Sequence, residues 1–109
     1  MEQKKLMERV QQSAFFRNNG IVLKAVHLLR GQYIALKDIC SALEPSMTET
    51  EFWDAVNYLS ECGYIQLRDK ESKQLTTLAD TSMNMLEAKV TADGIRIISC
   101  TRKDECIDV

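Results

Sequence analysis

Histidine, glycine and proline are scarce in this sequence, whose 109 residues include one histidine, four glycines and one proline. Because His27 stands alone, no Ser/His/Asp or Cys/His set for nucleophilic catalysis can be assembled from the pattern. The few glycines form no G-x-x-x-x-G-K-[ST] loop that would cradle a phosphate. These absences argue against an enzyme, and we expect neither catalysis nor a cofactor.

The four cysteines lack the close spacing of a metal site. Cys40, Cys62, Cys100 and Cys106 include no C-x-x-C pair, and a single histidine does not supply the usual paired zinc ligands. We therefore expect no metal and four free thiols in a reducing compartment. A disulfide or metal pair between Cys100 and Cys106 is the alternative.

Long apolar runs and a targeting segment are also missing. The most apolar stretch, residues 21–29, is interrupted by Lys24 and His27, and it is shorter than the roughly 18 residues that a membrane span needs. Residues 1–9 are charged and lack the apolar region of a signal peptide. We expect a cytoplasmic protein with no membrane partner.

Charge is what the chain has in quantity, with 14 basic and 16 acidic residues and a formal net charge of −2. Its length and its 45% hydrophobic content fit one globular domain over residues 1–109. Residues 1–30 hold six basic and two acidic side chains, whereas residues 31–63 hold one basic and six acidic ones. The balance excludes a strongly basic nucleic-acid coat and makes the middle of the chain its most acidic part.

The start of the chain predicts two helices. Residues 4–17 are rich in helix formers and bring Leu6, Val10 and Ala14 to one helix face. The Asn-Asn-Gly run at residues 18–20 is typical of a helix end, so we expect a break there. A second, mostly apolar helix follows over residues 21–30.

The next segments contain the strongest local signals. Gly31 ends the second helix, and residues 32–35 favour a short edge strand before an amphipathic helix over residues 36–43. Thr48 and Glu51 form a capping box, in which each side chain bonds the other residue's amide. The helix that they begin carries one apolar stripe and ends near Gly63; the stripe consists of Phe52, Ala55, Val56, Leu59 and Cys62.

The second half of the chain is less regular, and residues 74–84 show no clear period. We expect a strand at residues 64–67, a polar loop or hairpin tip at 68–73, a returning strand at 85–90, a short helix or strand at 95–100, and a polar tail at 101–109. That tail is expected either to fray or to make contacts.

This order of elements resembles the winged helix-turn-helix. The resemblance is carried by the helices at 36–43 and 48–62, by Leu59-x-x-x-Gly63-Tyr64-Ile65, and by Val90-Thr91-x-x-Gly94-Ile95, which is similar to the L-T-x-x-G of small winged-helix regulators. We therefore expect an α+β, mostly helical winged helix-turn-helix with an extra N-terminal helix at 1–17, a core at 20–100 with a small β-hairpin wing, and a tail at 101–109. The size and tail also resemble small winged-helix proteins of Mu-like phages and prophages.

The resemblance implies a transcription regulator that binds double-stranded DNA, with its second motif helix in the major groove and its wing on phosphates. The residues that match these roles are Thr50 and Asn57 on the helix and Arg68, Lys70 and Lys73 on the wing. The same helix has no lysine or arginine, although phosphate neutralisation supplies much of the affinity for DNA.

The acidic helix leaves a second interpretation open, in which the domain binds or assembles proteins and does not bind DNA through that helix. Trp53, on the flank of the apolar stripe, is then the candidate interface residue, because tryptophan is enriched at binding hot spots. The helix at residues 4–17 cannot bury its apolar side alone, so we also expect a homodimer.

Overall fold

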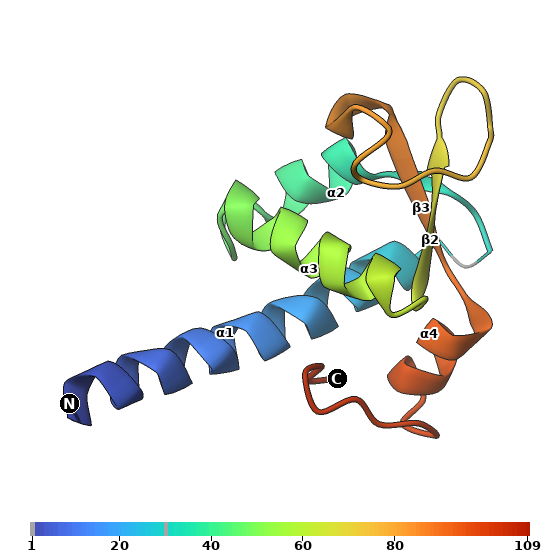
Figure 1. The fold of residues 1–109 in the computed structure, drawn as a ribbon. Coiled ribbons are helices and arrows are strands. Elements are labelled where there is room, and N and C mark those ends of the chain that lie inside the picture. Colours follow the sequence, from blue (N-terminus) through green and yellow to red (C-terminus); the bar gives the residue numbers. More distant parts are fainter. Residues whose placement is uncertain (1, 30) are drawn as a thin grey trace.

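The computed structural model describes residues 2–29 and 31–109, and over these residues the fold is α+β. Four α-helices and a three-stranded antiparallel sheet make up the described part of the chain (Figure 1). Helices α1, α2 and α3 pack on one side of the sheet, and α4 leads into the C-terminal tail.

The first helix, α1 (Glu2–His27), is continuous, so the expected break at residues 18–20 is wrong. Its C-terminal half lies in the core, where Val22, Leu23 and Val26 are buried. Its N-terminal half projects from the body of the molecule (Figure 1). The end expected for the second helix, Arg30, lies outside the described residues.

Long-range contacts explain why a helix-ending sequence stays helical. A Cβ on Gly20 would lie 1.7 Å from the carbonyl oxygen of Asp108, so glycine lets the tail touch the helix backbone. The Asn19 amide donates a hydrogen bond to the carbonyl of Cys106 (2.9 Å), and the Asp108 amide donates to the carbonyl of Phe16 (3.1 Å). Phe16, Asn19 and Gly20 of α1 thus contact the tail, which is held against the helix and is not frayed.

The middle of the chain forms as expected. A short strand β1 (Ile34–Ala35) precedes α2 (Leu36–Leu43), and α3 (Glu49–Glu61) begins at Thr48 with both hydrogen bonds of the capping box. The predicted helices and their capping signal are confirmed, because each depends on residues close in sequence.

The sheet places the last strand in its centre. Strands β2 (Ile65–Asp69) and β3 (Leu86–Val90) are antiparallel, and β1 pairs with the other edge of β3. The connection between β2 and β3 contains a 3-10 turn, Met83–Met85. Its Leu75 forms a single antiparallel bridge with Arg68. The expected returning strand is confirmed, whereas the connection is longer than a tight hairpin tip.

One face of the sheet closes the core against the helices. Alternate residues of β3 point inward, as do Ile65 and Leu67 of β2; the inward residues of β3 are Leu86, Ala88 and Val90. The largest buried side chain of α3, Phe52, is 1% exposed and belongs to the same apolar cluster. The other face of the sheet carries polar side chains.

The segment after β3 forms a helix, α4 (Ala92–Ile98), rather than a strand. Thr91 caps it by accepting a hydrogen bond from the Gly94 amide, and its hydroxyl donates to the carbonyl of Gly63 (2.6 Å). A Cβ on Gly94 would lie 2.2 Å from the carbonyl oxygen of Tyr64. The Thr-x-x-Gly pattern therefore joins α4 to the start of β2.

None of the helices in the described part of the chain is both long enough and apolar enough to cross a membrane.

Candidate functional site

The outward face of α3 is polar and acidic. Thr50, Asp54, Asn57 and Glu61 follow one another at helical spacing, and all four are exposed. Thr50 and Asn57, which the sequence predicted to contact DNA, thus share this exposed face. The two carboxylates on the same face carry the charge that phosphates repel.

One side of this face is bordered by the β2–β3 connection. Asn57 and Glu61 line a hollow of about 380 Å³ together with residues 76–79 of the connection. The end of α3 is therefore flanked by a loop that contributes hydroxyls from Thr76 and Thr77 and no basic group.

Trp53 lies on the other side of α3 and is half-buried. Its ring meets the ring of Phe52 edge-on, with centroids 5.1 Å apart. It lines a hollow of about 160 Å³ between α2, α3 and the 3-10 turn, beside Cys40 and Met83. The indole Nε1 is buried without a hydrogen-bond partner among the described residues, so this side chain is largely packed within the fold.

Two of the three basic residues predicted for the wing are held by a carboxylate. Glu87 is 7% exposed, and its Oε1 lies 2.5 Å from Arg68 Nε and 3.5 Å from Lys73 Nζ. The Arg68 guanidinium also stacks over the ring of Tyr33, 3.7 Å from its centroid. This pairing with Glu87 takes much of the positive charge that a phosphate would meet.

Glu87 was not among the residues that sequence reasoning selected. The alternation in residues 85–90 does place it on the face opposite Leu86 and Ala88. Its partner depends on the register, which sets Arg68 opposite Glu87 and is not visible in either strand alone.

Lys70, in the β2–β3 connection, is exposed and, unlike Arg68 and Lys73, forms no ion pair within the part of the chain described. It sits in a turn organised by Asp69, whose carboxylate accepts hydrogen bonds from the amides of Glu71 and Ser72. The bonds from the Ser72 and Glu71 amides lower the pKa of Asp69 below its usual value. The turn thus presents one free cation with Glu71 beside it.

The C-terminal tail is fixed by one half-buried carboxylate, that of Asp104. Asp104 accepts hydrogen bonds from the hydroxyls of Tyr58 (2.8 Å) and Tyr64 (2.7 Å) and from the Cys106 amide (2.8 Å). Burial raises the pKa of Asp104, but these hydrogen bonds outweigh it and hold the pKa below its usual value. Burial and the bond to Asp104 raise the pKa of Tyr64 to about 12.

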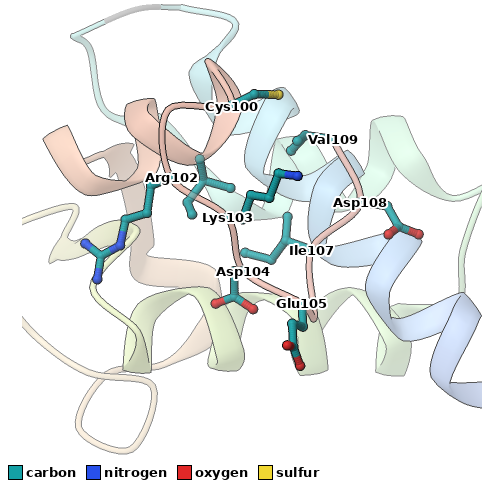
Figure 2. A pocket seen from close by; sticks show the side chains of 9 residues that line it. Cys100, Arg102, Lys103, Asp104, Glu105, Ile107, Asp108 and Val109 are labelled. Carbon is teal, nitrogen blue, oxygen red and sulfur yellow. The ribbon is translucent and has the colours of Figure 1, made fainter.

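Beside this carboxylate the tail curves over a hollow of about 380 Å³ (Figure 2). Its lining mixes both signs, with Arg102 and Lys103 against Asp104 and Glu105, and Ile107 closes the tail onto the core. Since Asp104 is already bonded and Arg102 lies 3.2 Å from Asp93, the hollow belongs to the attachment of the tail.

The projecting half of α1 exposes apolar side chains. Leu6, Met7 and Val10 are 62%, 59% and 58% exposed. Where the helix meets the body, one flank borders a hollow of about 260 Å³ shared with α3, and the other borders a hollow lined by Arg9 and Arg17. Leu6 and Val10 of the predicted apolar stripe are thus exposed, whereas its third member, Ala14, is half-buried beside the hollow shared with α3.

Comparison with protein-family models, curated proteins and solved structures found no match to this chain. Among the described residues, no group of three or more histidine, cysteine or acidic side chains is arranged to hold a metal ion. All four cysteines are free, so the alternative of a Cys100–Cys106 disulfide is not formed here.

Proposed function

We propose that the fold is a winged helix-turn-helix in which α1 merges the N-terminal helix and the first core helix. The order helix, strand, helix, helix, strand, connection, strand supports this assignment. So does the sheet order β1-β3-β2, which sets the returning strand between the other two. In this assignment α2 and α3 are the helix-turn-helix pair, and the β2–β3 connection is the wing.

We further propose that the protein acts as an assembly module that associates through the projecting half of α1. The observation that carries this proposal is the exposure of Leu6, Met7 and Val10 on a helix that leaves the body of the molecule. Fully burying such a side chain contributes about 1.5–3 kcal/mol, so the six side chains of a symmetric pair contribute roughly 9–18 kcal/mol against an association cost of about 4–15 kcal/mol. The acidic outward face of α3 favours this function over DNA reading by that helix.

The test is the molar mass of the purified chain measured by sedimentation across a range of concentrations. We expect a concentration-dependent oligomer, and Leu6→Lys with Val10→Lys should weaken its association at least about tenfold, since several kcal/mol of apolar burial is lost. Leu75→Lys is the matched control, because Leu75 is 65% exposed on the wing. A monomer at every concentration contradicts the proposal, as does equal weakening by the control.

Binding of double-stranded DNA is the second candidate function, favoured by the wing and by the free cation Lys70 in its turn. In it, Thr50 and Asn57 face the bases, and Lys70, Lys73 and Arg68 hold phosphates. Fluorescence anisotropy of a random duplex at low salt tests it. Lys70→Glu with Lys73→Glu should abolish binding if the wing holds phosphates, and an unchanged or absent affinity rejects this candidate.

A further inference from the structure

The two flanks of the apolar stripe on α1 differ in charge. On the flank that faces α3, a hollow of about 260 Å³ is lined by the carboxylates of Glu51 and Asp54 and has no basic residue; its other lining residues are Gln11, Ala14, Phe15 and Asn18. On the opposite flank, Arg9 and Arg17 line a hollow that also reaches Asp108. Val10 and Ala14 of the apolar stripe line this second hollow, and Ala14 also lines the first.

The carboxylates of the first hollow are suited to receive a cation. The hydrogen bond from the Thr48 amide to Glu51 Oε1 (2.9 Å) lowers the pKa of Glu51, and its Oε2 accepts a hydrogen bond from Asn18 (3.2 Å). Asp54 is exposed and forms no ion pair within the described residues. Asp54 is therefore the acidic group that remains available to a partner.

We propose that this hollow receives the N-terminal arm (residues 2–10) of a second copy of the chain, in an antiparallel pairing of two α1 helices about Val10. The inference rests on the proposed assembly function and names its partner and its register. Two-fold symmetry about Val10 sets Leu6 of each copy against the partner's Ala14, so both stripes are covered by the same contact. The helices then overlap from residue 2 to residue 18, a length of about 24 Å at 1.5 Å per residue.

The helix positions of the charged residues agree with this register. Lys4 precedes Gln11 and Phe15 by seven and eleven residues, so it lies on the flank that faces α3. In the antiparallel pair this flank meets the same flank of the partner, which brings Lys4 to the partner's Asp54. On the other flank, Glu2 reaches the level of the partner's Arg17, so each arm places opposite charges at both contacts.

The overall division of charge favours a second copy over an unrelated partner. The arm, residues 2–10, carries three basic and two acidic groups, and the hollow that receives it is lined by two acidic groups and no basic one. One copy thus supplies both a basic arm and an acidic receiving face, which is the self-complementarity that a two-fold interface requires. Lys5 provides an internal control, because it lies about 140° around the helix from Val10, on the side away from α3, and lines neither hollow.

A charge-reversal cycle in the full chain tests the register by sedimentation equilibrium at low salt. We expect Lys4→Glu and Asp54→Lys each to weaken dimerisation about tenfold, and the double variant to recover most of the wild-type association. Lys5→Glu should leave the dimerisation constant within about twofold, since this side chain faces solvent in the pair. Circular dichroism of each variant establishes that the fold is retained.

The outcomes separate the two proposals. A dimer in which the double variant loses as much as the two single losses combined overturns the register, while the assembly function stands. Equal loss with Lys4→Glu and Lys5→Glu overturns it in the same way. A wild-type chain that remains monomeric removes the assembly function itself.

Discussion

Gly20 is a residue at which helix propensity and packing oppose each other. In an exposed helix, Gly→Ala stabilises by about 0.5–1 kcal/mol. Here the added Cβ would meet the Asp108 carbonyl, a backbone atom, at 1.7 Å. We expect Gly20→Ala to displace the tail and lower the free energy of unfolding by about 1–2 kcal/mol, measured by urea denaturation. Ser13→Ala, on the exposed part of α1, should change it by less than about 0.5 kcal/mol, and a stabilising Gly20→Ala would contradict the tail contact.

Asp104 makes the attachment of the tail dependent on pH. Its pKa in the folded protein lies below the unfolded value, so its contribution is present above the unfolded pKa of about 4 and is lost as pH falls through the folded pKa. At pH 7, Asp104→Asn should cost about 1–3 kcal/mol, because two tyrosine hydroxyls lose a charged acceptor. Urea denaturation at falling pH should show this difference shrinking below about pH 4. A difference that stays constant down to about pH 2 would contradict the role of the ionised carboxylate.

At the scale of elements, the turn that follows β2 contains a strained residue. Lys73 has φ 62°, a left-handed conformation that costs a non-glycine residue about 1 kcal/mol. Its ion pair with Glu87 is exposed on the lysine side and contributes little. We expect Lys73→Gly to raise the free energy of unfolding by about 0.5–1 kcal/mol. Lys70→Gly, in the same turn without positive φ, should not raise it, and equal effects would show that the left-handed backbone is not the cause.

The elements predicted correctly are those whose signals are local. The capping box at Thr48 and Glu51 and the alternation around Ala88 need only neighbouring residues, so both were visible in the sequence. The unbroken α1 was not, because the contact that favours it joins Gly20 to Asp108 at the far end of the chain. A local helix-ending pattern was therefore outweighed by tertiary packing.

The residues of the candidate site also divide into those with a local sequence signal and those that depend on long-range contacts. Helical periodicity correctly placed Thr50 and Asn57 on the exposed face of α3. It could not show that Arg68 is paired with Glu87, since that contact depends on the register between two strands. The basic count of the wing therefore overstated the positive charge that it offers to DNA.

At the scale of the whole molecule, the two candidate functions predict different responses to salt. The described residues extend over 50 × 31 × 24 Å because α1 projects, and this projection gives the apolar stripe its access to a partner. Association through the stripe should respond weakly to salt, since exposed ion pairs such as Lys4 with the partner's Asp54 contribute only about 0–1 kcal/mol each and burial of Leu6 and Val10 is not screened. We expect the dimer dissociation constant to rise by no more than about tenfold between 0.05 and 0.5 M sodium chloride.

Binding of DNA through phosphate contacts of Arg68, Lys70 and Lys73 would fall by about 40-fold between 0.05 and 0.2 M salt. Sedimentation equilibrium of the free chain measures the salt dependence of dimerisation. In the same buffers, the anisotropy of a labelled duplex measures the salt dependence of DNA binding. Leu75→Lys, which alters an exposed apolar residue of the wing, should leave the salt dependence of dimerisation unchanged. A dimer that dissociates steeply with salt contradicts an apolar stripe as its main support, because burial of Leu6 and Val10 has no counterions to release.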